Sequence, residues 1–273
     1  MIHDENSMMN SLKLGHLGIE AVYPLAPMQR DLYLTSVLHP DTRDVCVGLA
    51  ISMNEPFDIA AWKSVLLEFH QEQPILRTRI YQGAEQPDGD SETVACQCVL
   101  RQASLNFDVQ DLRAIELSED KIESLVRDFI YAPYDIHSNE LVRYRVWRLS
   151  NNRTICSLAC HHIVMDGISG VLHLNQSVAR YNEYVENGIN VVTIGSTKIT
   201  KVKASYLELA EKHCQDFDSD VIRDFWSPRL RDIEPLSMGG RPVIADDDNH
   251  IVREFLTFDT DQLTRLRVTA AKM

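Results

Sequence analysis

The chain has 273 residues, of which 44% are hydrophobic and 25% charged, a composition typical of a globular core. The 40 Asp and Glu residues outnumber the 27 Lys and Arg residues, which gives a formal net charge of -13. An acidic surface repels phosphate backbones, so nucleic acid is not an expected partner. No segment approaches the ~20 apolar residues that cross a bilayer, so a membrane is not an expected partner either.

The six cysteines show no CxxC pair and no regular spacing. Four of them lie in apolar, strand-like segments, where an unpaired thiol behaves as a small hydrophobic group. This pattern favours a reducing compartment, and we expect a cytoplasmic location. The six are Cys46, Cys96, Cys98, Cys156, Cys160 and Cys214.

Residues 1–19 are polar and mixed, which is typical of a flexible lead-in. A helix is expected to open in the segment 23–30, with Pro27 in its first turn, where a missing N–H costs nothing. Segment 45–53 alternates large apolar residues with Cys, Gly, Ala and Ser. This alternation predicts a strand with another element packed closely on its small-residue face.

Asp58 can cap the next helix, and Ser118 can cap a later one. Between these helices, strands are expected at 76–81 and 94–100, with a polar loop joining them. The first helix has one apolar face formed by Trp62, Val65, Leu66 and Phe69. The second has a similar face formed by Ile122, Leu125, Val126 and Phe129.

Further strands are expected at 141–149 and 154–162. After Gly170, apolar residues recur every three or four positions, which predicts a long amphipathic helix that ends near Asn187. Strands and helices therefore interleave up to that point, and residues 188–200 are typical of a linker.

Beyond the linker, helices are expected at 203–214 and 218–231, then a strand at 251–258 and a last helix from Thr260. That last helix runs to the end of the sequence with no capping signal. Residues 201–273 therefore resemble the start of an incomplete second lobe.

The strand at 154–162 ends in two adjacent histidines, His161 and His162. Successive strand side chains point to opposite faces, so one histidine can face a cleft while the other is fixed inside the protein. Asp166 and Gly167 follow at a turn before the long helix. A histidine placed there could act as a general base near neutral pH, and backbone N–H groups of the turn could stabilise an oxyanion.

Residue types alone leave three interpretations open. A zinc site could use the two histidines and Asp166, although opposed faces and the lack of other clustered ligands weigh against it. The histidines could be purely structural, with Asp166 capping the following helix. The turn could also catalyse acyl transfer.

The stretch His-His-Ile-Val-Met-Asp-Gly-Ile-Ser at 161–169 resembles the HHxxxDGxS signature of condensation domains of nonribosomal peptide synthetases and of related acyltransferases. Four other segments resemble motifs of that family in the same order, and the resemblance covers roughly residues 20–273. The four are 24–29, 74–78, 133–136 with Leu141 and Arg143, and Phe225-Trp226 with Leu230.

This resemblance implies an α+β fold, a chloramphenicol-acetyltransferase-like mixed sheet with flanking helices, with an N-terminal lobe at 20–187. It also implies that His162 is the catalytic residue and His161 a supporting one. The backbone of Gly167 would lie beside the reacting carbonyl. Asp166 would hold the loop through an arginine, for which the candidates are Arg77, Arg143 and Arg145.

The implied reaction forms an amide bond between a carrier-bound donor acyl or peptidyl thioester and an acceptor aminoacyl amine. Partner carrier domains would supply the phosphopantetheine arms, adjacent synthetase domains would be further partners, and no metal or directly bound cofactor is implied. A related CoA- or carrier-dependent acyltransferase, an epimerisation domain and an inactive scaffold are the alternatives.

Two departures from the family pattern stand out. Glu72 and Gln73 occupy positions where the family usually has Arg-His, and Ile168 stands where many members have Trp. The family's second lobe also continues past Met273, so we expect this chain to hold one wall of the active-site tunnel and to show little activity alone.

Overall fold

The computed structural model describes residues 18–53, 56–82, 95–138, 141–185, 206–216, 219–231, 233 and 259–270. Several expected features lie outside these residues, namely the lead-in before residue 18, the polar loop after residue 82, the linker at 188–200 and the strand at 251–258. The chain divides into two units, residues 1–233 and 234–273. Within the second unit, the described part is the helix α8 (Thr260–Ala270).

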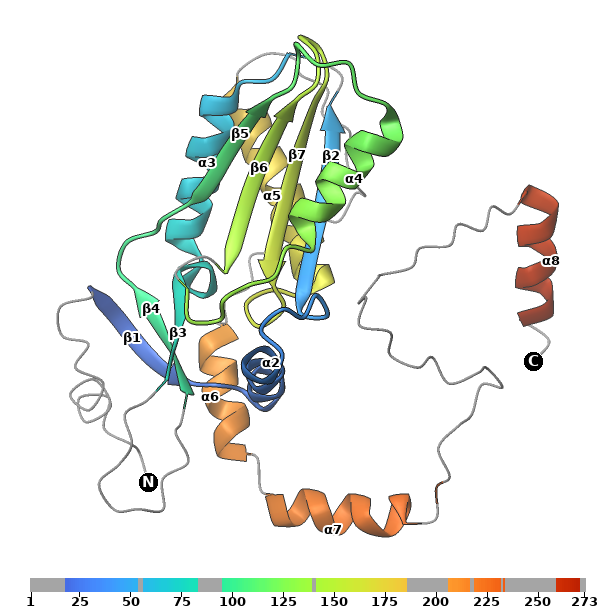
Figure 1. Cartoon of the computed structure of the whole chain (residues 1–273). Helices are drawn as coiled ribbons and strands as arrows, with labels where there is room; N and C mark the ends of the chain where they lie inside the picture. Colours follow the sequence, from blue (N-terminus) through green and yellow to red (C-terminus); the bar gives the residue numbers. More distant parts are fainter. Residues whose placement is uncertain are drawn as a thin grey trace. The chain divides into compact units, whose positions relative to one another are not determined.

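A four-stranded sheet forms the centre of the first unit (Figure 1). Its order is β2 (Cys46–Met53), β7 (Thr154–His161), β6 (Val142–Arg148) and β5 (Asn106–Asp111). β7 pairs antiparallel with both neighbours, whereas β5 and β6 are parallel. Every residue of β7 is buried, so the strand that ends in the histidines lies in the middle of the core.

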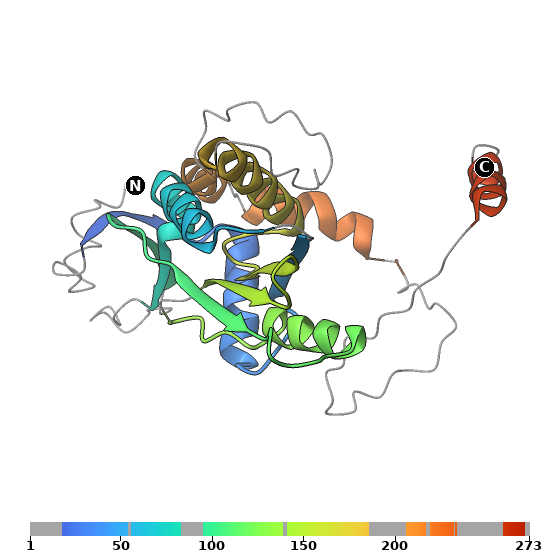
Figure 2. The ribbon, with the colours of Figure 1, turned by 90° about the horizontal axis from the view of Figure 1, so that it is seen from above.

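Helices cover both faces of this sheet. α3 (Ile59–Glu72) and α5 (Gly167–Tyr184) lie on one face, and α4 (Glu119–Ile130) lies on the other (Figure 2). The two predicted helix caps are confirmed: a side-chain oxygen of Asp58 accepts hydrogen bonds from two backbone N–H groups, and that of Ser118 from one. The caps satisfy donors that the first helical turn leaves without partners.

The small-residue face of β2 receives α4, as the alternation at 45–53 predicts. A Cβ atom added to Gly48 would lie 2.5 Å from Cγ2 of Ile130 and 2.7 Å from the carbonyl oxygen of Leu158. Both separations are far below van der Waals contact. Glycine at this position is therefore what lets the helix approach the sheet.

A second, three-stranded antiparallel sheet has the order β1 (Ile19–Pro24), β4 (Ala95–Leu100) and β3 (Thr78–Gln82). The short 3-10 helix η1 (Pro74–Arg77) precedes β3, and α2 (Pro27–Leu38) follows β1. Both sheets and their helices together give the expected mixed α/β fold.

The helix expected to open in 23–30 is present as α2, with Pro27 in its first turn as predicted, whereas residues 23 and 24 end β1 because they pair with β4 across a long sequence separation. One expected strand boundary was wrong and one strand was missed. The strand expected from residue 76 begins at Thr78, since Pro74 starts a 3-10 turn. β5 was missed because its Asn and Asp residues are poor strand formers, tolerated here on a strand with β6 as its described neighbour.

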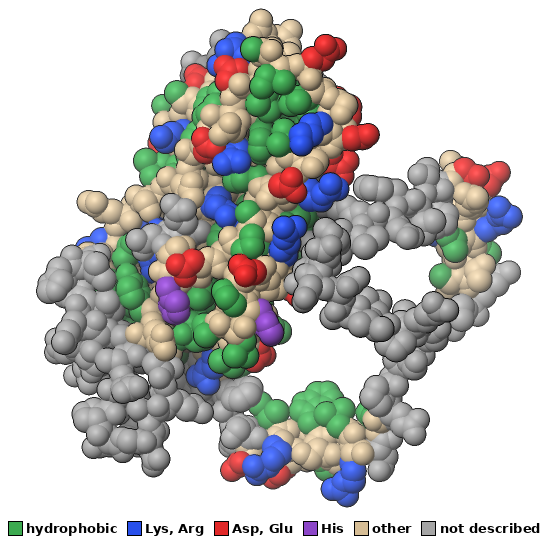
Figure 3. Space-filling model, in the orientation of Figure 1, with side chains coloured by type: hydrophobic (Ala, Val, Ile, Leu, Met, Phe, Trp, Pro, Cys, Tyr) green, Lys and Arg blue, Asp and Glu red, His purple; other side chains and the backbone are tan. Residues whose placement is uncertain are grey.

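α6 (Tyr206–Asp216) packs against β1 and η1 and buries Leu207 and Ala210. It therefore lies with the first unit, although the sequence assigned it to a second lobe. α7 (Ser219–Leu230) carries exposed apolar side chains (Figure 3), which include Val221, Ile222, Phe225 and Trp226. None of the described helices is both long enough and apolar enough to cross a membrane.

Candidate active site

Neighbouring strands hold the end of β7 from both sides. The backbone N–H of His161 donates to the carbonyl oxygen of Leu141 (2.9 Å), and that of His162 donates to the carbonyl oxygen of Val45 (2.7 Å). The last residue of the strand and the residue after it are thereby fixed to the segments that border β6 and β2. The two histidine side chains leave this anchored backbone in different environments.

His161 is fully buried and hydrogen-bonded on both ring nitrogens. Its Nδ1 accepts from the backbone N–H of Ile163 (3.0 Å), so the neutral ring carries its proton on Nε2. Nε2 lies 2.9 Å from Oγ of Ser36, which in turn donates to the carbonyl oxygen of Leu32 (2.7 Å). Burial, helped by the nearby His162, lowers the pKa of His161 to about 4, so the ring is neutral at physiological pH. It joins α2 to the end of β7.

His162 is partly exposed, and no described residue hydrogen-bonds its imidazole. The three residues that follow it, Ile163, Val164 and Met165, are buried and anchor the turn in the core. Its imidazole lies near Asp166, whose pKa it helps to lower. The arrangement presents one ring of the histidine pair towards solvent at the start of the turn.

Asp166 ends the turn as the N-cap of α5. Its Oδ1 accepts from the backbone N–H of Ser169 (2.7 Å), and hydrogen bonds from Ser169 are the main reason that its pKa lies below the ordinary aspartate value. Gly167 begins the helix with open space beside it, because a Cβ added there would meet no atom within 4 Å. Asp166 and Gly167 are both exposed.

The predicted arginine partner of Asp166 is not found among the described residues. Arg77 pairs with Glu20 (2.7 Å) and also donates to the Leu100 carbonyl oxygen. An exposed Asp166 satisfied by backbone N–H groups does not need a buried cation, which explains the difference.

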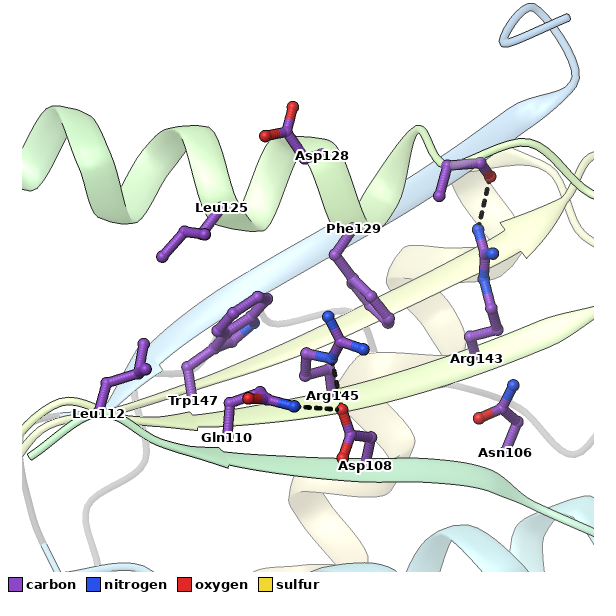
Figure 4. A pocket seen from close by; sticks show the side chains of 11 residues that line it. Asn106, Asp108, Gln110, Leu112, Leu125, Asp128, Phe129, Arg143, Arg145 and Trp147 are labelled. Carbon is purple, nitrogen blue, oxygen red and sulfur yellow. Dashed lines mark hydrogen bonds and ion pairs between the residues drawn. The ribbon is translucent and has the colours of Figure 1, made fainter. Parts of the chain in front are cut away.

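The other two candidate arginines line a pocket of about 470 Å³ between α4 and the β5–β6 pair (Figure 4). The guanidinium of Arg143 stacks 3.8 Å from the ring centroid of Tyr134 and donates to the carbonyl oxygen of Ala132 (2.7 Å). Nε of Arg145 lies 2.8 Å from a carboxylate oxygen of Asp108. Both arginines therefore have partners of their own.

A pair of buried glutamines, which the sequence did not single out as a site feature, reaches the turn from α2 and β4. Nε2 of Gln29 donates to the carbonyl oxygen of Ile163 (2.9 Å), the residue after His162. Gln29 and Gln97 also exchange side-chain hydrogen bonds (3.0 and 3.1 Å), and Gln97 donates to the carbonyl oxygen of Pro24 (2.8 Å). The pair links the second sheet to the turn.

The unusual Glu72 has a local charge partner. Its carboxylate lies 2.5 Å from the guanidinium of Arg180 on α5, so it ties the end of α3 to the neighbouring helix. Within the described residues, no group of three or more His, Cys, Asp or Glu side chains is arranged to hold a metal ion.

The fold and the turn define an α/β domain whose central strand delivers a histidine to the N-terminus of a long helix. The chain belongs to the condensation domain family, whose model matches residues 19–271. It is 25% identical over 222 residues to one of the subunits of linear gramicidin synthase from Brevibacillus parabrevis, a match that covers 80% of this chain and 4% of that protein. It is 24% identical over 263 residues to surfactin synthase subunit 2 of Bacillus subtilis, covering 93% and 7%.

Solved structures show the same fold. The starter condensation domain of the rhizomide synthetase RzmA, in a mutant crystallised with C8-CoA and Leu-SNAC, matches with a TM-score of 0.65 and 19% identity. That match covers 88% of this chain and 50% of the solved chain. The four-domain nonribosomal peptide synthetase AB3403 matches with a TM-score of 0.60 and 18% identity, covering 78% and 15%. The chain thus spans about half the length of the solved condensation domain.

Proposed function

We propose that this chain contributes the histidine-bearing part of a condensation active site, which joins a carrier-bound acyl or peptidyl donor to the amine of an acceptor aminoacyl thioester. The observation that carries the proposal is His162, a partly exposed histidine at the end of the central strand, one short turn before the N-terminus of α5. Membership of the condensation domain family supports it.

In the proposed reaction, the acceptor amine attacks the donor thioester carbonyl. His162 orients the amine or takes its proton, the tetrahedral oxyanion collapses, and the carrier thiolate leaves and is protonated. Asp166 occupies the N–H groups of Ser169 and Gly170, which leaves the first two N–H groups of α5 as donors for the oxyanion. The N–H groups of Gly167 and Ile168 have no described acceptor and stand where a helix N-terminus favours negative charge.

The partners in this proposal are a donor and an acceptor carrier domain, each supplying a phosphopantetheine arm, together with adjacent synthetase domains. The names of the curated relatives, which are synthase subunits, support this setting. The cytoplasmic location expected from the cysteines belongs to the same proposal. So does a second lobe that begins beyond α6, which the extension of the family match to residue 271 supports.

A CoA thioester is the second donor class to test, because a solved starter condensation domain of this fold was crystallised with C8-CoA. The experiment incubates the intact protein with a loaded acceptor carrier and either a loaded donor carrier or an acyl-CoA, and measures the amide product by mass spectrometry. Product from the carrier donor supports a condensation domain acting between carriers. Product from acyl-CoA alone would replace that conclusion with a starter-type acyltransferase.

Three variants separate chemistry from folding. The His162→Ala protein should lose at least 100-fold in turnover and keep its melting temperature, on the scale that general base catalysis contributes, about 10² to 10⁴. The exposed His39→Ala variant is the matched control and should retain turnover. The His161→Ala variant should lower the melting temperature, because it leaves Ser36 and the Ile163 N–H without their buried partner. Full turnover in the His162→Ala protein would remove His162 from the mechanism.

A further inference from the structure

Two cysteines touch each other on the second sheet, away from the histidine turn. Cys96 and Cys98 are two residues apart on β4, so their side chains share a face, and their Sγ atoms lie 3.8 Å apart. Their exposed fractions are 1% and 0%. With Ile19 and Val22 they form a small cluster separate from the main core. The pair is therefore a preassembled dithiol buried in this small cluster.

The chemistry of this pair differs from that of the other cysteines. The hydrogen bond between the two thiols lowers the pKa of Cys96 below the ordinary cysteine value, while Cys98 as its partner has a raised pKa. Burial instead raises the pKa of Cys46 to about 11, that of Cys160 to about 12, and that of Cys156. Among the cysteines whose side chains are described, Cys96 alone is shifted towards the thiolate, which is the reactive form.

A bond between the two sulfurs requires the strand to bend. Two residues of strand span about 6.6 Å between Cα atoms, from a rise of roughly 3.3 Å per residue. Disulfides are found at Cα separations up to about 6.8 Å and cannot form beyond about 7 Å without backbone movement. The Cα separation thus lies at the upper limit. A disulfide also brings its Cβ atoms to about 3.5–4.5 Å, so the strand must bend and the bond would be strained and readily reduced.

We propose that Cys96 and Cys98 form an oxidisable dithiol that hydrogen peroxide closes to an intrastrand disulfide. The Cys96 thiolate attacks one peroxide oxygen, the O–O bond breaks, and Cys96 becomes a sulfenic acid while hydroxide leaves. The sulfur of Cys98 then attacks the sulfenic sulfur, the S–S bond forms, and the S–O bond breaks. The departing oxygen and the displaced hydroxide leave as water, so two thiols lose two electrons and one peroxide yields two waters.

The disulfide would bear on the histidine turn through Gln97, which stands between the two cysteines. Its side chain projects to the opposite face of β4 and bonds Gln29, which holds the carbonyl oxygen of Ile163. Closing the sulfurs from 3.8 Å to about 2.05 Å bends the strand at Gln97 and weakens that link. This consequence for turnover rests on the proposed function, whereas the dithiol chemistry does not.

The test uses the tryptic fragment 80–101, which contains both cysteines and no other. The intact protein is treated with hydrogen peroxide, free thiols are alkylated, and the digest is analysed by mass spectrometry. The expected result is a fragment two hydrogens lighter and resistant to alkylation, with both changes reversed by dithiothreitol. Retention of both thiols in this fragment, while fragments with Cys46 or Cys160 oxidise first, would overturn the proposal.

Three variants, one of them a control, test the order of steps. In the Cys98→Ser protein the disulfide cannot form, and a sulfenic acid trapped by dimedone should accumulate on Cys96. The Cys156→Ser protein is the buried control and should oxidise at 80–101 as the wild type does. Dimedone labelling of Cys98 in the Cys96→Ser protein, with none of Cys96 in the Cys98→Ser protein, would contradict the assignment of Cys96 as the attacking thiol. Because the readout is a mass, it stands whether or not the protein condenses substrates.

Discussion

At the scale of single residues, Asp166 acts on the helix that follows it. Its carboxylate caps α5 through the N–H of Ser169, and the residue is exposed. Asp166→Ala should therefore cost about 1 kcal/mol of unfolding free energy, the usual effect of removing an N-cap, and Asp166→Asn should cost less. Urea denaturation measures both. A loss of roughly 3–5 kcal/mol from Asp166→Ala would instead indicate a buried ion pair.

Gly167 offers a way to separate a substrate contact from a structural need for glycine. The space beside it is open, so the alanine of Gly167→Ala meets no protein atom, and the smaller entropy of the unfolded chain should stabilise the fold by roughly 0.4–1 kcal/mol. If a substrate carbonyl passes this position, the added methyl obstructs it and turnover should fall about tenfold or more. Melting temperature and the condensation assay are measured on the same sample. Unchanged turnover would show that nothing approaches the Gly167 backbone.

At the scale of elements, the Gln29–Gln97 pair should couple α2 and β4 energetically. Both side chains are buried, with exposed fractions of 2% and 0%, so Gln97→Leu leaves buried groups of Gln29 and Pro24 without a partner and should cost about 1–3 kcal/mol. Gln29→Leu should cost a similar amount. The double variant should cost less than the sum, by about 0.5–3 kcal/mol, in a cycle measured by urea unfolding.

The exposed Gln71 supplies the control for this cycle, since it too bonds two backbone groups, the carbonyl oxygen of Arg101 and the N–H of Ala103. Water can replace those bonds, so Gln71→Leu should change stability by about 0.5 kcal/mol or less. Strict additivity of the two buried substitutions would mean that the side-chain contact adds nothing to the link between α2 and β4.

The local sequence pattern predicted much of this architecture but little of the link that Gln29 and Gln97 make. The helix caps at Asp58 and Ser118 and the close approach at Gly48 follow from neighbouring residues, and all three are present. The contact of Gln29 with Ile163 spans 134 positions and that with Gln97 spans 68, so no short-range pattern encodes either. The motif placed His162 at a strand end, but only packing decides which partner each nearby charge takes.

At the scale of the whole molecule, a row of buried, hydrogen-bonded polar side chains joins α3, β6 and α5 in the core. The hydroxyl of Tyr144 lies 2.7 Å from Nε2 of both His70 and His173. One hydroxyl proton can serve only one of these nitrogens, so the other ring must donate to the hydroxyl oxygen, and the two histidines are opposite tautomers. Within the described structure, neither Nδ1 has a hydrogen-bond partner, so either ring, once doubly protonated, would bury an Nδ1–H group without an acceptor.

The buried hydrogen bonds between His70, Tyr144 and His173 should make the fold sensitive to mild acid. Burial, with a smaller contribution from Arg79, lowers the pKa of His70 to about 4, and burial, with a smaller contribution from His70, lowers that of His173 to about 3. An unfolded histidine has a pKa of about 6.5, so between roughly pH 4 and 6.5 the unfolded chain binds protons that the folded chain refuses. Stability therefore falls as the pH falls through this window, by about 1.4 kcal/mol per pH unit for each such histidine.

The measurement is the free energy of unfolding by urea from pH 7.5 to 5, a range that lies above the ordinary titration of carboxylates. His70→Gln removes one titrating ring, so it should reduce the slope against pH by about 1.4 kcal/mol per unit below pH 6. Phe69→Leu is the control, because Phe69 packs on the His173 ring with centroids 4.6 Å apart and its loss should lower stability at every pH without changing the slope. Equal slopes for His70→Gln and the wild type would mean that His70 binds its proton equally well in the folded and the unfolded protein. The hydrogen bonds of Tyr144 would then involve a charged imidazolium.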